Sequence, residues 1–148
     1  MKKLFLILSV LVFQLGLSQE SKIKIVESKK IELTGELSKD KINFYNQQFV
    51  KFVAALKVKD KQAIDNLISD KVKDIVDDNM LQILSGGISF ERKMEIYKSG
   101  NQMLFENETY PAIQYKYVDD KLTPPRDVIT VLFENDGKIL GVKPDYSK

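Results

Sequence analysis

Four tyrosines are the side chains in this sequence that are best placed to do chemistry. Tyr45, Tyr97, Tyr115 and Tyr117 all fall at positions whose spacing predicts an inward-facing side chain. A buried phenol needs a hydrogen-bond partner, so four of them close together would line a moderately polar ligand pocket between helices and a sheet. In the alternative, the rings belong to the core and the hydroxyls reach its rim.

The sequence contains no histidine and no cysteine. Their absence excludes Ser-His-Asp and Cys-His nucleophile systems, imidazole-ligated zinc, disulfides and thiol chemistry. Among the carboxylates, Asp70, Asp74 and Asp77 are spaced to share one face of a helix. That face is either a weak surface for cations or cationic partners, or a solvated face beside Lys71 and Lys73. We expect no metal site and no cofactor, and a non-enzymatic role is favoured over catalysis.

The stretch Asn135-Asp136-Gly137 is either a tight turn or part of a cation-binding loop. A calcium loop needs alternating oxygen ligands and a bidentate glutamate, whereas the residues on both sides here are apolar and strand-like. We therefore predict a three-residue hairpin turn closed by Gly137 in the left-handed region. The resulting register pairs Glu134 with Lys138, Phe133 with Ile139, Leu132 with Leu140, and Val131 with Gly141.

This register predicts two apolar faces on the last hairpin. One face belongs to the core under the helices and holds Ile129, Val131, Phe133 and Ile139. The other face holds Val128, Leu132, Leu140 and Val142. An apolar stripe of this kind needs a cover, which would come from residues 22–33, from the C-terminal tail, or from a second copy of the chain in a homodimer.

Hydrophobic periodicity predicts helices first and strands afterwards. A first helix starts near Ser38 or Asp40, a second is capped by Asp60, a third runs from Ser69-Asp70 to Gly86-Gly87, and a fourth starts at Ser89 and carries Phe90, Met94 and Tyr97. Strands follow around 113–117, 128–134 and 138–142, with Asp119-Asp120 as turn residues before Pro124-Pro125. The fold class is α+β, with N-terminal helices packed on a C-terminal antiparallel β-meander.

The first residues have the parts of a secretory signal. Lys2-Lys3 precede an apolar core from Leu4 to Phe13, and Gly16 and Ser18 supply the small residues of a cleavage site. We expect residues 1–18 to be removed, residues 19–37 to form a tail or an edge strand, and residues 38–148 to form one domain. Without cysteine the chain is not a lipoprotein, so the processed protein is expected in the periplasm or medium with no stable membrane span.

Processing also changes the charge. Loss of Lys2 and Lys3 reduces the 23 basic residues to 21, which equals the 21 acidic residues. A nucleic-acid-binding protein normally keeps a basic excess, so this class of partner is disfavoured.

Two segments carry a resemblance to a known family. The helical "FVKFVAALKVKDKQAIDNLIS" and the late "VITVLFENDGKILGV", within residues 38–144, resemble the nuclear transport factor 2-like superfamily of the cystatin-like group, which includes small secreted bacterial proteins. The resemblance implies a helix pair packed into a curved antiparallel sheet around a conical pocket. Its enzymes usually use an Asp-His or Asp-Tyr pair, and this chain lacks histidine.

Three functional hypotheses follow. The first is a secreted, non-enzymatic domain that binds a small ligand or a protein partner, and the second is a self-associating structural protein. The third is an isomerase, dehydratase or hydrolase that uses a carboxylate and Tyr115 or Tyr117 as acid and base, and it rests on the resemblance alone.

Overall fold

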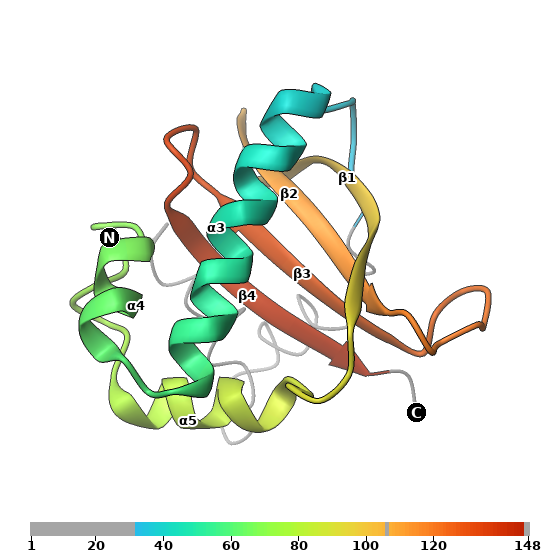
Figure 1. Cartoon of the computed structure of the whole chain (residues 1–148). Helices are drawn as coiled ribbons and strands as arrows, with labels where there is room; N and C mark the ends of the chain where they lie inside the picture. Colours follow the sequence, from blue (N-terminus) through green and yellow to red (C-terminus); the bar gives the residue numbers. More distant parts are fainter. Residues whose placement is uncertain (1–31, 106, 147–148) are drawn as a thin grey trace, which may run out of the picture.

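The fold is built on one long helix laid across an antiparallel sheet (Figure 1). The structure is a computed structural model, and it describes residues 32–105 and 107–146. Over these residues it contains three helices and a four-stranded sheet in the order β1-β2-β3-β4. The elements are α3 (Lys39–Lys57), α4 (Lys61–Leu67), α5 (Asp78–Gly87), β1 (Met94–Phe105), β2 (Glu108–Tyr117), β3 (Asp127–Phe133) and β4 (Ile139–Tyr146). The predicted α+β class, with helices before strands, is confirmed.

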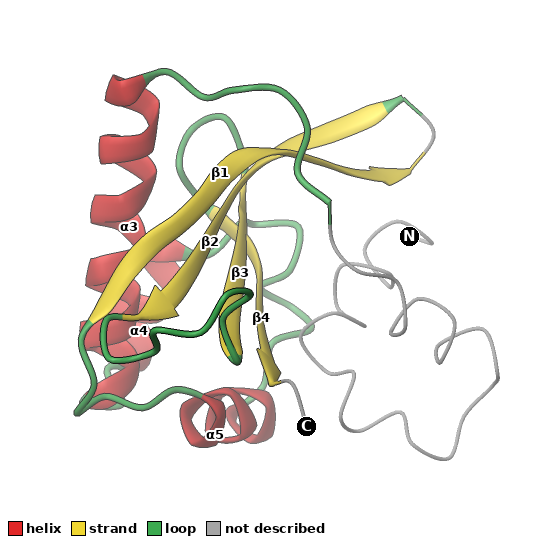
Figure 2. Ribbon diagram, turned by 90° about the vertical axis from the view of Figure 1, so that its right-hand side faces the viewer, coloured by secondary structure: helices red, strands yellow, loops and turns green. Residues whose placement is uncertain are grey.

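Helix α3 forms where the sequence predicts it. The Ser38 hydroxyl caps its first turn by accepting a hydrogen bond from the Lys41 N–H at 3.3 Å. Apolar and aromatic residues recur every three or four positions, which places one stripe against the sheet. Tyr45, Phe49 and Phe52 from this stripe are each at most 2% exposed. Figure 2 shows α3 on one side of the sheet, with α5 at its end.

The second and third helices are joined by a segment that the sequence predicted only in part. Asp60 caps α4, as expected, by accepting from the Ala63 N–H at 3.1 Å. The predicted helix from Ser69-Asp70 is a series of turns instead, and α5 begins eight residues later with Asp77 as its cap. The cause is tertiary: the Ser69 N–H donates to the Ile139 carbonyl at 2.8 Å, which ties this segment to β4.

The predicted fourth helix is wrong, because residues 94–105 form strand β1. Its spacing of Phe90, Met94 and Tyr97 suits a helix, but the segment pairs with β2 over its full length. Gly100 contributes to the change, since a Cβ there would lie 3.0 Å from the Thr34 carbonyl oxygen. The segment 33–35 lies against β1 at this point, and Thr34 and Asn101 exchange backbone hydrogen bonds of 2.8 and 2.7 Å. Most of the segment 19–37, and all of the expected signal 1–18, lie outside the described residues.

The last hairpin has the predicted turn and a different register beyond it. Gly137 adopts φ of +91°, and the Glu134 N–H donates to the Lys138 carbonyl at 2.8 Å. Phe133 pairs with Ile139 as expected, but Leu132 then pairs with Gly141 and Val131 with Val142. The extra residue is Leu140, in a β-bulge that shifts every later residue of β4 by one position.

Candidate functional site

The four predicted site tyrosines do not surround a common pocket. Tyr45 stacks on Phe133 with ring centroids 4.9 Å apart, beside the turn of the last hairpin. The Tyr115 ring lies 4.5 Å from the Phe49 ring, and its hydroxyl donates to the Asn46 side-chain oxygen at 3.1 Å. Burial raises the pKa of Tyr115 above its ordinary value, which keeps this phenol protonated. Both residues therefore belong to the hydrophobic core.

Tyr117 and Tyr97 lie elsewhere on the sheet. The Tyr117 hydroxyl accepts a hydrogen bond from the Ser89 N–H at 2.9 Å, and the Arg92 guanidinium stacks 3.9 Å above its ring. Tyr97 is half-buried in an irregularity of β1, where the Lys98 ammonium lies 5.0 Å from its ring centroid. The hydroxyl partners of Tyr115 and Tyr117 are thus an amide oxygen and a backbone N–H, and not the carboxylate that an acid/base pair requires. The geometry favours core packing over a shared polar pocket.

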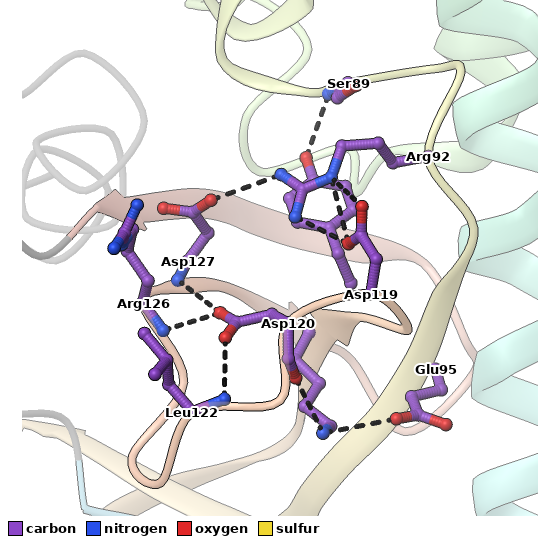
Figure 3. A network of polar contacts seen from close by, with 10 residues as sticks. Ser89, Arg92, Glu95, Asp119, Asp120, Leu122, Arg126 and Asp127 are labelled. Atoms are coloured by element: carbon purple, nitrogen blue, oxygen red, sulfur yellow. Dashed lines mark hydrogen bonds and ion pairs between the residues drawn. The ribbon is translucent and has the colours of Figure 1, made fainter.

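Charged residues gather where strand β2 ends and the chain turns back (Figure 3). Arg92 forms a bidentate pair with Asp119, with its shortest contact 2.6 Å, and also reaches Asp127 at 3.3 Å. The hydrogen bonds between Arg92 and Asp119 hold the pKa of the Asp119 carboxyl below its usual value and raise the pKa of Arg92. Because each charge here already has a partner, the network serves to position the loop.

Asp120 holds the same loop from inside. Its carboxylate accepts hydrogen bonds from the backbone N–H groups of Leu122, Arg126 and Asp127 at 2.6–3.3 Å. Burial alone would raise the pKa of Asp120, but these three donors outweigh it, and the pKa falls below its ordinary value. The prediction that Asp119-Asp120 makes a turn is confirmed.

A groove between the helices is large enough for a ligand, whereas the four tyrosines do not surround a common pocket. It lies where the end of α3, the start of α4 and one face of α5 meet, the corner at the lower left of Figure 1. Its volume is about 460 Å³, within the range of small-molecule sites. Its lining is Leu56, Lys59, Lys61, Ile64, Asp78, Leu81, Gln82 and Ser85.

The groove has an apolar floor and a polar rim. Leu56, Ile64 and Leu81 form the floor, and the first two are buried to 2% and 1% exposure. On the rim the Lys61 ammonium lies 2.6 Å from an Asp78 carboxylate oxygen, and this contact raises the pKa of Lys61. The pattern of a continuous apolar surface with a few polar groups at its edge is typical of a ligand site.

Lys59 stands at the rim in an unusual backbone conformation. Its φ is +58°, and the Lys59 and Asp60 N–H groups donate to the Leu56 and Ala55 carbonyls at 3.2 and 2.9 Å. These two bonds define a Schellman end of α3 with Lys59 at the left-handed position, where glycine is the usual residue. The sequence pattern predicts a helix break at this point but gives no indication of the groove.

A second cavity is a small apolar gap of about 20 Å³ between α5 and β4. Its lining includes Leu140 and Val142, two residues of the predicted outer stripe. Val142 pairs with Val131 and so shares its face, whereas Leu132 lies on the opposite face of the sheet. Leu132, Leu140 and Val142 are each at most 1% exposed, and Val128 is half-buried. The four residues therefore do not form one exposed stripe.

The acidic residues predicted to share a helical face are dispersed. Asp70 pairs with Lys73 at 2.5 Å, and Asp77 caps α5 by accepting from the Met80 N–H at 2.8 Å. Within residues 32–105 and 107–146, no group of acidic side chains is arranged to hold a metal ion. No helix in that same part of the chain is both long and apolar enough to cross a membrane.

Comparison of the chain with models of protein families, with curated proteins and with solved structures gives no match. A function must therefore be inferred from the geometry of the chain itself.

Proposed function

We propose that this protein is a secreted, non-enzymatic binding domain whose groove between α3, α4 and α5 takes a small ligand. One observation carries the proposal. The space between α3 and the sheet is filled by Tyr45, Phe49 and Phe52 packed on residues of the strands, while the groove outside it is hollow. A ligand of ordinary size fits the groove and has no equivalent space under the helix.

We also propose that the chain belongs to the nuclear transport factor 2-like superfamily. The element order supports this, since the helix pair α3 and α4 precedes an antiparallel sheet of four strands, with α5 as a further helix between them. Strand β1 supplies a fourth strand, beyond the three that the sequence pattern predicts. The proposed binding site differs from the conical pocket that the resemblance implies, because Tyr45, Phe49 and Phe52 pack between α3 and the sheet and the groove lies among the helices.

Secretion remains part of the proposal on the strength of the first residues. Lys2-Lys3, the apolar run 4–13 and the small residues Gly16 and Ser18 support an exported protein. Export is tested by expressing the full chain and determining the N-terminal residue of the product. An N-terminus at Gln19 or Glu20 is expected, and an intact Met1 in the cytoplasmic fraction would contradict it.

Binding is tested with a neutral, apolar fluorescent probe, N-phenyl-1-naphthylamine. We expect its emission to increase on entering the groove of the purified domain. Gln82→Phe fills the groove and should abolish the increase, whereas Asn79→Phe, at an exposed α5 position outside the lining, should leave it intact. Equal responses from the two variants, or no response from the parent protein, would overturn the proposal.

A further inference from the structure

The lining of the groove includes one lysine that is not paired with a carboxylate of the lining, which bears on the class of ligand it takes. The charged residues of the lining are Lys59, Lys61 and Asp78, and the nearby Asp65 and Asp77 also act on Lys61. Asp78 is already engaged with Lys61 at 2.6 Å. Lys57, the lysine that precedes Lys59 in the sequence, has its ammonium 3.9 Å from a Glu91 carboxylate oxygen. Among the residues that the structure describes, Lys59 has no carboxylate partner.

The backbone at Lys59 gives a second reason to single out this residue. A left-handed conformation at φ of +58° costs a residue with a Cβ about 1 kcal/mol relative to glycine. The Schellman hydrogen bonds to Leu56 and Ala55 would form equally well with glycine at this position. The end of the helix therefore does not require a lysine at this position, and the lysine that stands there lies on the rim of the groove.

The apolar floor of the groove lies beside Lys59. Leu56, in the last turn of α3, accepts the Lys59 N–H hydrogen bond, and Ile64 and Leu81 extend the apolar surface toward α5. A ligand that satisfies both parts must have an apolar body and a negatively charged end. The ammonium of lysine is a point charge with no planar fork, so it does not select between carboxylate and phosphate heads.

We propose that the groove binds an amphipathic anion, with its apolar chain on Leu56, Ile64 and Leu81 and its anionic head on the Lys59 ammonium. This inference rests on the proposed function, because it names the class of ligand for the same groove. It also assigns Lys59 as the residue that selects the charge of the ligand.

The test uses four probes that share an eight-carbon chain: octanoate, octyl phosphate, 1-octanol and octyltrimethylammonium. Each is titrated into the isotope-labelled protein while the amide signals of the groove residues are followed by NMR. We expect octanoate and octyl phosphate to bind at least about fivefold more tightly than 1-octanol and octyltrimethylammonium, as one exposed ion pair allows. The perturbed amides should be those of α4, α5 and the end of α3.

Lys59→Gly removes the ammonium without destabilising the fold, so a loss of binding in this variant cannot be attributed to unfolding. Glycine relieves the left-handed strain, so its melting temperature should equal or exceed that of the parent, while the preference for anions should disappear. Lys59→Arg keeps the charge and should keep the preference. Lys51→Gln removes the same charge from an exposed site on α3 outside the groove, and should change nothing.

The outcomes separate the two proposals. Equal affinity for all four probes, or an anion preference that survives in Lys59→Gly, overturns the assignment of an anion site while the groove still binds. Perturbation by octanoate at residues outside the groove overturns it as well. If N-phenyl-1-naphthylamine enters the groove and octanoate does not, this inference fails and the proposed function stands. If neither enters, both fail.

Discussion

Lys61 and Asp78 join the first turn of α4 to the first turn of α5 across the groove, with 2.6 Å between the ammonium and a carboxylate oxygen. The pair neutralises one of the two lysines on the rim. Its two side chains are 53% and 83% exposed, so solvent screens it and its contribution to folding stability is small.

Asp78→Asn should therefore act on binding more than on folding. With the carboxylate gone, Lys61 adds to the charge of Lys59, and the affinity for octanoate should rise about two- to fivefold. Asp40→Asn removes an acidic residue from the first turn of α3, away from the groove, and is the matched control for the loss of a helix N-terminal charge. Unchanged or weaker octanoate binding in Asp78→Asn would contradict an anion site on this rim.

Gly137 is predicted to be intolerant of any side chain. Its φ is +91°, and a Cβ there would lie 2.6 Å from the Phe44 ring. Gly137→Ala should lower the free energy of unfolding by about 1–3 kcal/mol, as measured by urea denaturation. Gly86→Ala in α5 is the control, because a Cβ added at Gly86 would have no neighbour within 4 Å and the helix should gain about 0.5–1 kcal/mol. Equal effects of the two changes would count against the turn described here.

Phe49 is predicted to be a principal stabilising residue of the core. Its ring is 1% exposed and lies between the rings of Phe52 and Tyr115, at 6.4 and 4.5 Å. Phe49→Ala should cost about 3–5 kcal/mol of unfolding free energy, since it removes a buried ring and leaves a cavity. The neighbouring Val50 is 58% exposed, and Val50→Ala should change the stability by less than about 0.5 kcal/mol. A small loss at Phe49 would mean that α3 does not pack on the sheet as described.

Asp120 should make the stability of the folded protein depend on pH in the acid range. Because the pKa of its carboxyl is lowered in the folded protein, its contribution is present above the ordinary pKa of 3.8 and is lost as the pH falls through the lower value. Asp120→Asn should lower the melting temperature at pH 7 and make the further loss between about pH 4 and pH 2 less steep. Asp145→Asn, at an exposed position of β4, should alter neither. An unchanged acid dependence in Asp120→Asn would contradict this role of Asp120.

The parts of the fold that the sequence predicted correctly are those set by neighbouring residues. Ser38 and Asp60 cap helices through contacts three residues away, and Asn135-Asp136-Gly137 makes its turn within itself. Strand β1 was missed because its pairing with β2 outweighs the helical spacing of its own apolar residues. The bulge at Leu140 was missed because hydrophobic alternation contains no signal for an extra residue.

The candidate site shows the same division. The tyrosines were correctly predicted to face inward at Tyr45, Tyr115 and Tyr117, but their distances from one another depend on the strand register and could not be known. The groove combines side chains from three helices, so no single stretch of sequence describes it. One local signal was present: Lys59 follows the end of a helical pattern at a position where glycine is usual.

The bulge at Leu140 decides which face of the sheet each later residue of strand β4 occupies. Gly141, Val142 and the residues after them reach their faces of the sheet because one residue more than the partner strand requires is inserted before them. A strand one residue shorter could form the same pairs, Leu132 with Gly141 and Val131 with Val142, because the bulged residue has no partner of its own. Deletion of Leu140 would therefore straighten the strand and keep Val142 toward the helices, whereas closing the bulge at unchanged length would pair Val131 with Gly141 and turn Val142 to the opposite face of the sheet.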